Sequence, residues 1–542
     1  MILDGRRIPQ DDELETDMCI VGAGATGITL ARSLDLSGLN VCLLESGGMD
    51  YDSQTNSLYE GRNLGLPYWP LAECQLRMIG GNTNGWGGWC RPLEALDFER
   101  RDWVPCSGWP FGAKELAPYY PRAQEICQLR RDNFDVAAAV SHLADPSAGV
   151  IPADPARFET HLYQFSPPTR FGRVYLDEIR RSERIMCLLH ATGMGIQVTN
   201  DASQVASMRA GSLTGARFRV RAKIYVLASG GIENARQLLL SRDVAPLGLG
   251  NDHDLVGRYF TEHPHTKRRM FLNAKRPALA LYGLKYYGRG LAARLSLTPA
   301  QQEHEALLGY SANLHAEYRG EAGAGFASLR KLVLTLSQSR SLDPFVRAPP
   351  YGPKGITARD IGNIIANLPG TTFSGFLQAF RTEAFVKHYV LESKSEQAPN
   401  RDSRVTLDHA RDRLGLNRSC LDWCTLPIDR RTIVRAEELL GEELQRLNIG
   451  RLEPLTPDEV ESWPRTGVEG GWHQLGTTRM ADNPREGVVD RNCRVHGVAN
   501  LFVAGGSVFP TVGTAPPTLT AVAMTLRLAD HLKQRFVAAV CK

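Results

Sequence analysis

Short apolar runs alternate with glycine-rich turns and amphipathic segments along much of the chain. Residues 17–21 and 40–44 are apolar runs of strand length, and residues 28–36 between them carry apolar side chains at helical spacing. This order predicts a strand, a helix and a second strand. Two further apolar runs, residues 224–228 and 501–504, also end in glycine-rich turns. A buried strand that ends in such a turn is typical of a parallel α/β sheet.

The rest of the chain shows helical spacing at three places, residues 233–241, 430–447 and 517–536. The pattern predicts short helices and loops over residues 101–180. Over residues 270–460 it predicts mixed strand and helix, with fewer clear turn signals between them. The glycine-rich turns lie far apart in the sequence. We therefore expect an α/β nucleotide-binding domain assembled from separate segments, with a second domain made largely from the less punctuated region.

Composition narrows the function classes. The chain has 542 residues, with 63 Lys and Arg against 59 Asp and Glu, so its net charge is +4 and it shows no basic footprint for nucleic acid. The 11 cysteines are scattered without a CxxC pair, and the spacing of Cys420 and Cys424 is poor for zinc. We expect no metal site, no membrane span and a reducing, cytoplasmic location, although export together with a partner chain stays open.

The first glycine turn has the spacing of a dinucleotide site. Gly22, Gly24 and Gly27 form G-x-G-x-x-G between the predicted strand and helix. The first glycine permits the tight turn, the second lets a pyrophosphate approach the backbone, and the third lets helix and strand pack closely. Ala25 and Thr26 stand in the first turn of the helix, where free N–H groups and the helix dipole favour phosphates.

Glu45 closes the second predicted strand and is placed to accept hydrogen bonds from a ribose hydroxyl. A carboxylate at this position repels a 2′-phosphate, which argues against NADP. The motif does not distinguish NAD from FAD. A glycine-rich turn that binds nothing is the alternative interpretation.

Three motifs carry a resemblance to a known family. They are the glycine turn at residues 22–27, the knot GGNTNGWGG at residues 80–88, and the C-terminal run at residues 472–506, which begins WHQLGTTRM. They resemble the glucose–methanol–choline (GMC) oxidoreductases. Residues 254–264 and 395–407 are similar to bacterial members of that family that act on sugars. The similarity extends nearly from end to end.

The resemblance implies an FAD-dependent enzyme that oxidises an alcohol group of a sugar, glycoside, related polyol or biosynthetic intermediate to a carbonyl. It also implies a discontinuous Rossmann-like FAD domain, formed by residues 1–100, 181–270 and 465–542. Residues 101–180 and 271–464 would form a substrate domain on a mostly antiparallel sheet with helices. No motif identifies the electron acceptor, which is oxygen, a quinone or a protein.

The same resemblance places His473 at the family's catalytic histidine. An imidazole there would take the hydroxyl proton while the hydride passes to flavin N5. Pro516 stands where the family has a second His or Asn, and a proline side chain makes no hydrogen bond. Thr511, Thr514 or a residue from 270–460 are candidates to replace it. This departure opens an alternative, lyase- or elimination-type chemistry on the same fold; a non-catalytic nucleotide-binding protein is more remote.

The remaining expected cofactor contacts lie in the glycine turns and at the last helix. Gly85 stands where some relatives carry a flavin-linked histidine, so we expect non-covalent FAD. Backbone N–H groups from Thr518 onward would face the N1/O2 edge of the flavin. Trp86 is equally compatible with core packing. The full expected set is Gly22, Gly24, Ala25, Thr26, Gly27, Glu45, Gly81, Trp86, Gly87, Gly88, Ala228, Gly505, Gly506 and Thr518.

Overall fold

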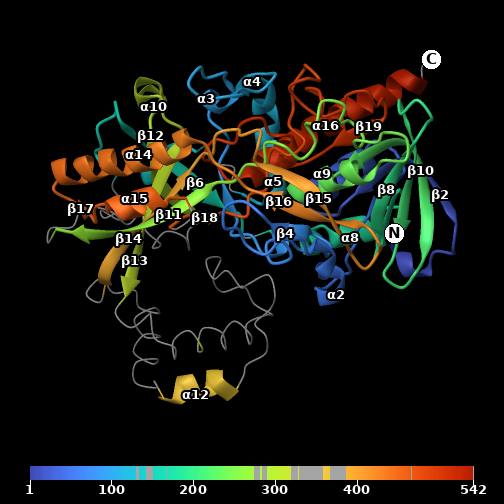
Figure 1. Ribbon diagram of the computed structural model, residues 1–542, viewed down its shortest axis with the longest axis horizontal. Coiled ribbons are helices and arrows are strands. Elements are labelled where there is room, and N and C mark those ends of the chain that lie inside the picture. Colours follow the sequence, from blue (N-terminus) through green and yellow to red (C-terminus); the bar gives the residue numbers. More distant parts are fainter. Residues whose placement is uncertain are drawn as a thin grey trace.

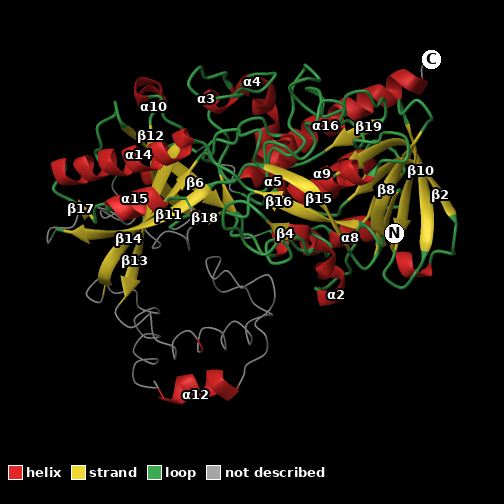
Figure 2. Cartoon of the chain, in the orientation of Figure 1, coloured by secondary structure: helices red, strands yellow, loops and turns green. Residues whose placement is uncertain are grey.

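Two large sheets lie at opposite ends of the molecule, with a small sheet between them (Figure 1). Figure 2 shows the helices that cover them. The computed structural model describes residues 1–129, 134–141, 150–167, 169–273, 281–282, 290–318, 328, 358–366, 386–464 and 467–540. None of the helices within these ranges is both long enough and apolar enough to cross a membrane.

The first sheet contains the predicted strand–helix–strand opening. Its order is β1-β7-β3-β2-β10-β9-β8, and β19 pairs with β10. The neighbours from β1 to β10, and β19 with β10, are parallel, whereas β8, β9 and β10 are antiparallel neighbours. The strands are β1 Ile2–Asp4, β2 Glu13–Val21, β3 Val41–Leu44, β7 Ile185–Leu189, β8 Thr192–Val198, β9 Val205–Gly211, β10 Arg217–Leu227 and β19 Leu501–Val503.

Apolar burial explains why these segments form one layer. All of β3 and the last four residues of β2 are buried, as expected of parallel strands covered on both faces. Helices α1 (Ala25–Asp35), α9 (Gly231–Leu240) and α16 (Pro517–Val540) add side chains to the same core. The predicted βαβ opening and the α/β fold class are thus confirmed, with element ends shifted by a few residues.

The second sheet is antiparallel throughout its described pairs. Its order is β17-β11-β14-β13-β12-β6-β5, with β18 paired to β11. Helix α14 (Pro427–Arg446), predicted at 430–447, packs on one face through Leu439, Leu440 and Leu444. The strands are β5 Trp89–Cys90, β6 Phe158–Phe165, β11 Pro264–Leu272, β12 Leu291–Leu297, β13 Tyr310–Tyr318, β14 Val386–Ser395, β17 Gly450–Leu452 and β18 Glu469–Gly470.

Smaller elements connect the two sheets. The central sheet has the order β15-β16-β4, from Arg404–Arg411, Asn417–Asp422 and Arg62–Asn63. The short helices are α2 Ser53–Asn56, α3 Ala95–Phe98, α4 Ala113–Leu116, α5 Tyr120–Ile126, α6 Val136–Ser141, α7 Phe171–Val174, α8 Leu176–Arg181, α10 Pro299–Glu305, α12 Ala358–Ala366 and α15 Pro457–Ser462. The chain therefore places a parallel, nucleotide-type sheet beside an antiparallel one.

Candidate active site

The first glycine turn is shaped by close backbone contacts. Gly22 has φ +107°, and a Cβ there would lie 2.6 Å from the carbonyl oxygen of Ala228. A Cβ on Gly27 would lie 1.9 Å from the carbonyl oxygen of Gly22. Both positions therefore require glycine for the turn and for helix packing. Gly24 differs, because a Cβ there would meet no atom within 4 Å.

Open space beside Gly24 is bounded by two other glycine turns. A Cβ on Gly81 would lie 3.3 Å from the Cα of Gly24, and one on Gly505 would lie 3.7 Å from Oγ1 of Thr26. Three segments far apart in the sequence thus meet at the first turn of α1, which includes Ala25. Exposed N–H groups and absent side chains fit a dinucleotide phosphate here. The residues present therefore fit FAD.

Glu45 is buried at the end of β3 and holds the glycine turn. Its carboxylate accepts hydrogen bonds from the backbone N–H of Ala23 (3.0 Å) and of Gly47 (2.8 Å). Burial raises the pKa of Glu45, opposed by these two hydrogen bonds and by the charge of Arg77. A hydrogen bond from Glu45 to a ribose hydroxyl stays a prediction.

The knot at residues 80–88 packs against the first core. Nε1 of Trp86 donates to the carbonyl of Thr169 (2.9 Å), and its ring lies edge-on to Phe171. These contacts give Trp86 a packing role, and its contact with flavin stays a prediction. Gly88, which follows Gly87, accepts from the N–H of Ser166 (2.8 Å).

The C-terminal positions lie around the same region. Gly506 accepts a hydrogen bond from the N–H of Gly476 (3.2 Å), which ties the turn after β19 to the loop that carries His473. Thr518 is in the first turn of α16 and is half-buried. Pro516 is buried just before that helix.

A pair of histidines lies where the second sheet meets the C-terminal loops. Nδ1 of His473 is 2.7 Å from Nδ1 of His263, and Nε2 of His263 is 2.9 Å from the carbonyl oxygen of Gly513. His263 is fully buried at the start of β11, whereas His473 is half-buried. The rings of His473 and His265 are 6.5 Å apart. The predicted base therefore has a histidine partner that sequence reasoning left without a role.

The pair has one consistent arrangement of protons. Burial, with Lys394 and His265 nearby, lowers the pKa of His263 well below its usual value, so this ring is neutral. A carbonyl oxygen only accepts, so Nε2 of His263 carries the proton and donates to Gly513. Nδ1 of His263 then accepts from Nδ1–H of His473. In neutral His473, Nε2 is then the nitrogen that carries no proton.

Glu262, next to His263 in the sequence, is the second residue that sequence reasoning missed. Its fully buried carboxylate accepts a hydrogen bond from the hydroxyl of Tyr68. It also accepts from the backbone N–H groups of His263 and Gly471, both at 3.0 Å. Burial raises the pKa of Glu262 to about 7. The signal in the sequence is the Glu-His-Pro run at residues 262–264, which ends the segment that resembles bacterial members of the family.

The two threonines near Pro516 have different surroundings. The hydroxyl of Thr511 is buried and donates to the carbonyl of Asp97 (2.5 Å), so it is committed to the protein. Thr514 is half-buried, and its methyl group lies beside Gly309. Gly513 between them receives the His263 hydrogen bond. The loop before α16 thus contributes a backbone carbonyl to the histidine pair.

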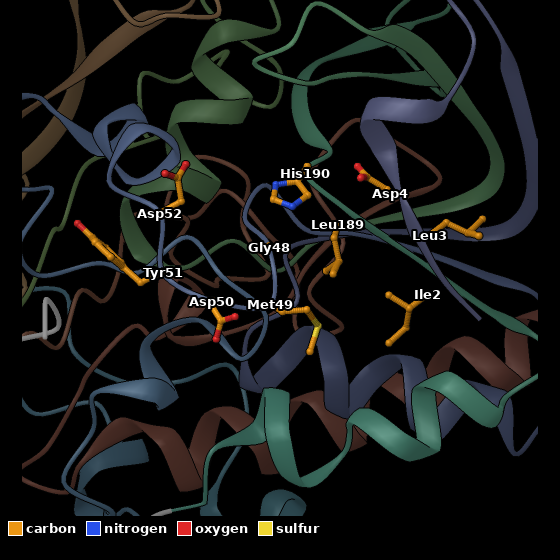
Figure 3. Close-up of a pocket in the computed structure, with 10 residues that line it drawn as sticks. All are labelled: Ile2, Leu3, Asp4, Gly48, Met49, Asp50, Tyr51, Asp52, Leu189 and His190. Atoms are coloured by element: carbon orange, nitrogen blue, oxygen red, sulfur yellow. The ribbon is translucent and has the colours of Figure 1, made fainter. Parts of the chain in front are cut away.

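A surface pocket lies away from these residues, at the edge of the first sheet (Figure 3). It is formed by β1, the loop after β3 and the end of β7, and none of the residues expected in the site lines it. Its lining is Ile2, Leu3, Asp4, Gly48, Met49, Asp50, Tyr51, Asp52, Leu189 and His190.

Comparisons with known proteins find relatives of this chain. The profile of the GMC oxidoreductase family matches residues 399–525. The chain is 26% identical to 6'''-hydroxyparomomycin C oxidase of Streptomyces lividus, over 95% of this chain and 92% of that protein. It is 23% identical to 2-methyl-1,2-propanediol dehydrogenase of Mycolicibacterium austroafricanum, over 96% of each.

Solved structures share the fold. The structure matches pyridoxine 4-oxidase from Mesorbium loti with a TM-score of 0.59 at 16% identity, covering 96% of this chain and 99% of that one. It matches a fungal aryl-alcohol oxidase with a TM-score of 0.59 at 15% identity, covering 98% and 100%.

The fold, the glycine cradle and these relatives define an FAD-dependent oxidoreductase that acts on CH–OH groups. The chain is thus similar to GMC oxidoreductases, through the family profile over residues 399–525 and through relatives that align with nearly its whole length.

Proposed function

We propose that this protein oxidises an alcohol group of a sugar, glycoside or related polyol to a carbonyl, with His473 as the base. The hydrogen-bonded series from Gly513 through His263 to His473 carries this proposal. It supports an imidazole that is protonated at Nδ1, so that Nε2 is its basic nitrogen. The named activities of the relatives, oxidation of a hydroxylated paromomycin and of a propanediol, support the substrate class.

In this proposal Nε2 of His473 takes the proton of the substrate hydroxyl. FAD, when bound, would supply the acceptor for the hydride of the alcohol carbon. The alcohol would then lose two electrons and two hydrogens in all, one hydrogen from carbon as hydride and one from oxygen as a proton. His263 is a positioning residue. Its Nδ1 accepts the hydrogen bond from Nδ1–H of His473 and so keeps the proton of His473 on Nδ1, which leaves Nε2 as the base.

The cofactor would be held non-covalently, because Gly85 offers no side chain for a bond. Gly24, Gly81 and Gly505 would surround the phosphates, and Glu45 would accept from the ribose. We keep the proposed division, with residues 1–100, 181–270 and 465–542 as the FAD domain and residues 101–180 and 271–464 as the substrate domain. The first segments supply every strand of the first sheet, which supports this division. They also supply β5, β18 and most of β11 to the second sheet, so the chain crosses between the two sheets within them.

An anaerobic flavin titration tests the proposal. We expect the purified holoenzyme to bleach with members of a sugar and polyol panel, and His473→Ala to slow bleaching by about 10²–10⁴-fold. His409→Ala is the control, because His409 is exposed on β15. Turnover without flavin reduction would contradict the proposal and favour the elimination chemistry that Pro516 suggests. Flavin released on denaturation would support non-covalent binding.

A further inference from the structure

One face of the second sheet is polar although it is buried. Strand register places His265 opposite Lys394, Lys394 opposite Ser311, and Ser311 opposite Ser296. Directly opposed residues in an antiparallel sheet project from the same face, and so do residues two apart in a strand. Arg294 therefore projects with Ser296. We call the face defined by these five residues the polar sheet face.

The opposite face carries Leu295, Ala312 and Leu391 and packs against α14. The two faces of one sheet thus have different environments. Side-chain atoms without a hydrogen-bond partner gather on the polar side and its extension over β6. They are Nε2 of His265, Oγ of Ser296, Oγ of Ser311, Nε and Nη1 of Arg294, Nδ1 of His161 and the hydroxyl of Tyr163.

The polar sheet face is directed toward the proposed base. The ring of His265 lies 6.5 Å from the ring of His473, and a Cβ on Gly471 would lie 2.8 Å from Nε2 of His265. Buried polar groups in native proteins almost always have partners. A group of them left without partners beside a reaction centre indicates a polar ligand.

Arg294 is the member of this group that carries a permanent positive charge. The residue is 4% exposed, and its Nε and Nη1 have no hydrogen-bond partner. No carboxylate among the described residues forms an ion pair with it, and its guanidinium lies over the rings of Trp89 (4.9 Å) and Tyr163 (5.6 Å). An arginine stays protonated in proteins, so this is a buried positive charge without a counter-ion.

A second buried arginine of the same region shows what is missing. Arg101 is also almost fully buried, but two of its nitrogens donate to the carboxylate of Glu396, at 2.8 Å and 2.5 Å. This is the bidentate geometry in which a guanidinium matches a carboxylate. Arg294 carries the same guanidinium group, but no carboxylate of the described residues pairs with it.

We propose that Arg294 binds a carboxylate of the substrate, so that the enzyme acts on an acidic polyol of the uronic- or aldonic-acid class. As a statement about the substrate, this rests on the proposed function. β12 is three strands from β11, which places Arg294 and His265 about 14 Å apart along the sheet at their backbones. The carboxylate would therefore lie at the end of the substrate away from the reacting hydroxyl, with Ser296 and Ser311 between as partners for hydroxyl groups.

Matched pairs of sugars test this proposal, because each pair differs in one charge. The pairs are D-glucuronate with D-glucuronamide, D-galacturonate with D-galacturonamide, and D-gluconate with sorbitol, and D-glucosamine adds a cation. We expect anaerobic flavin reduction by the best carboxylate to half-saturate at a concentration about tenfold to hundredfold below that of its neutral partner. D-glucosamine should be the poorest member.

Arg294→Gln should remove that preference by raising the half-saturating concentration of the carboxylate without a matching loss in limiting rate. Arg294→Lys should restore part of it, because it keeps the charge and loses the fork. Arg451→Gln is the matched control, since Arg451 also lies over an aromatic ring of this sheet (4.9 Å from Phe271) but is exposed on the edge strand β17. Preserved flavin absorbance would show that each variant is folded.

Calorimetric titration of the same carboxylates into the holoenzyme gives a second readout. Neutral sugars that bleach the flavin while carboxylates neither bleach nor bind would overturn the Arg294 proposal and leave the proposed function standing. An unchanged preference in Arg294→Gln would also overturn it. Carboxylates that bind in an Arg294-dependent way but never reduce the flavin would support the subsite and contradict the proposed oxidation.

Discussion

The two large sheets treat their buried surface differently. In the first sheet, β2 and β3 are apolar where they are buried, and α1, α9 and α16 complete their core. In the second sheet, one face packs on α14 and the other buries polar side chains that lack partners. The first sheet fills its buried surface with apolar side chains of the protein itself, except for the open space beside the glycine turns. The second has buried polar groups that lack partners among the described residues, and we propose that a ligand supplies them.

The two buried arginines give the largest expected effect. Glu396→Gln leaves Arg101 buried without a full charge partner and should lower the free energy of unfolding by about 3–5 kcal/mol. Arg294→Met should change it little or raise it, because no protein carboxylate is lost. Chemical denaturation of the ligand-free protein measures both. Equal losses in the two variants would show that Arg294 has a structural role and would break the comparison between the sheets.

A double variant is the control for the stability loss expected in Glu396→Gln. The double variant Arg101→Met with Glu396→Leu should recover most of the stability lost by Glu396→Gln, since it removes both charges together. A double variant no more stable than Glu396→Gln would mean that the effect comes from packing.

Glu262, at the junction of the second sheet and the histidine loop, should make stability depend on pH. A carboxyl group has a pKa of about 4.3 in the unfolded chain, and burial raises that of Glu262 to about 7. Between these values the folded state holds a proton that the unfolded state has released. Stability from this group is therefore present below about pH 4.3 and is lost as pH rises to about 7, by about 4 kcal/mol.

Glu262→Gln should remove this slope, so that the variant gains stability relative to the parent as pH rises. Denaturation curves at pH 4.5, 6 and 8 measure it. A constant difference between the two proteins across this range would show that Glu262 does not titrate there.

The glycine turn of the first sheet separates folding from cofactor binding. Gly27→Ala should destabilise the protein by about 1–3 kcal/mol or more, since its Cβ would lie 1.9 Å from the carbonyl oxygen of Gly22. Gly24→Ala should keep the stability of the apoprotein and weaken FAD binding, because its Cβ would enter the open space of the cradle. Thermal unfolding of apoprotein and fluorescence titration with FAD distinguish the two. Normal FAD affinity in Gly24→Ala would place the phosphates elsewhere.

The smallest expected effect concerns proton placement. His263→Leu removes the acceptor for Nδ1–H of His473 and should lower the rate of flavin reduction by about tenfold to a hundredfold. His263→Asn should recover part of the rate, because its amide oxygen offers an acceptor near the same place. The pH profile of the reductive half-reaction should shift in the leucine variant and not in the asparagine variant. Unshifted profiles in both would limit His263 to packing.

Much of the first sheet was predictable because its information is local. Residues 17–45 hold two strands, a helix and a glycine turn in a short window, and apolar periodicity alone indicates each of them. The C-terminal helix was likewise found at its first residue, Pro517, because proline is favoured there. The likeness of the C-terminal run to the GMC family then indicated FAD and the position of His473.

Long-range contacts decided what the sequence could not show. His263 and His473 are 210 residues apart, and Arg101 and Glu396 are 295 apart, so no local pattern pairs them. Burial also depends on every neighbouring element, and it is burial that neutralises His263 and raises the pKa of Glu262. The sequence by itself determined the nucleotide-type sheet and its glycine turn. Only the tertiary structure decided which face of the second sheet meets His473, and it buried Arg294 on that face with no carboxylate partner among the described residues.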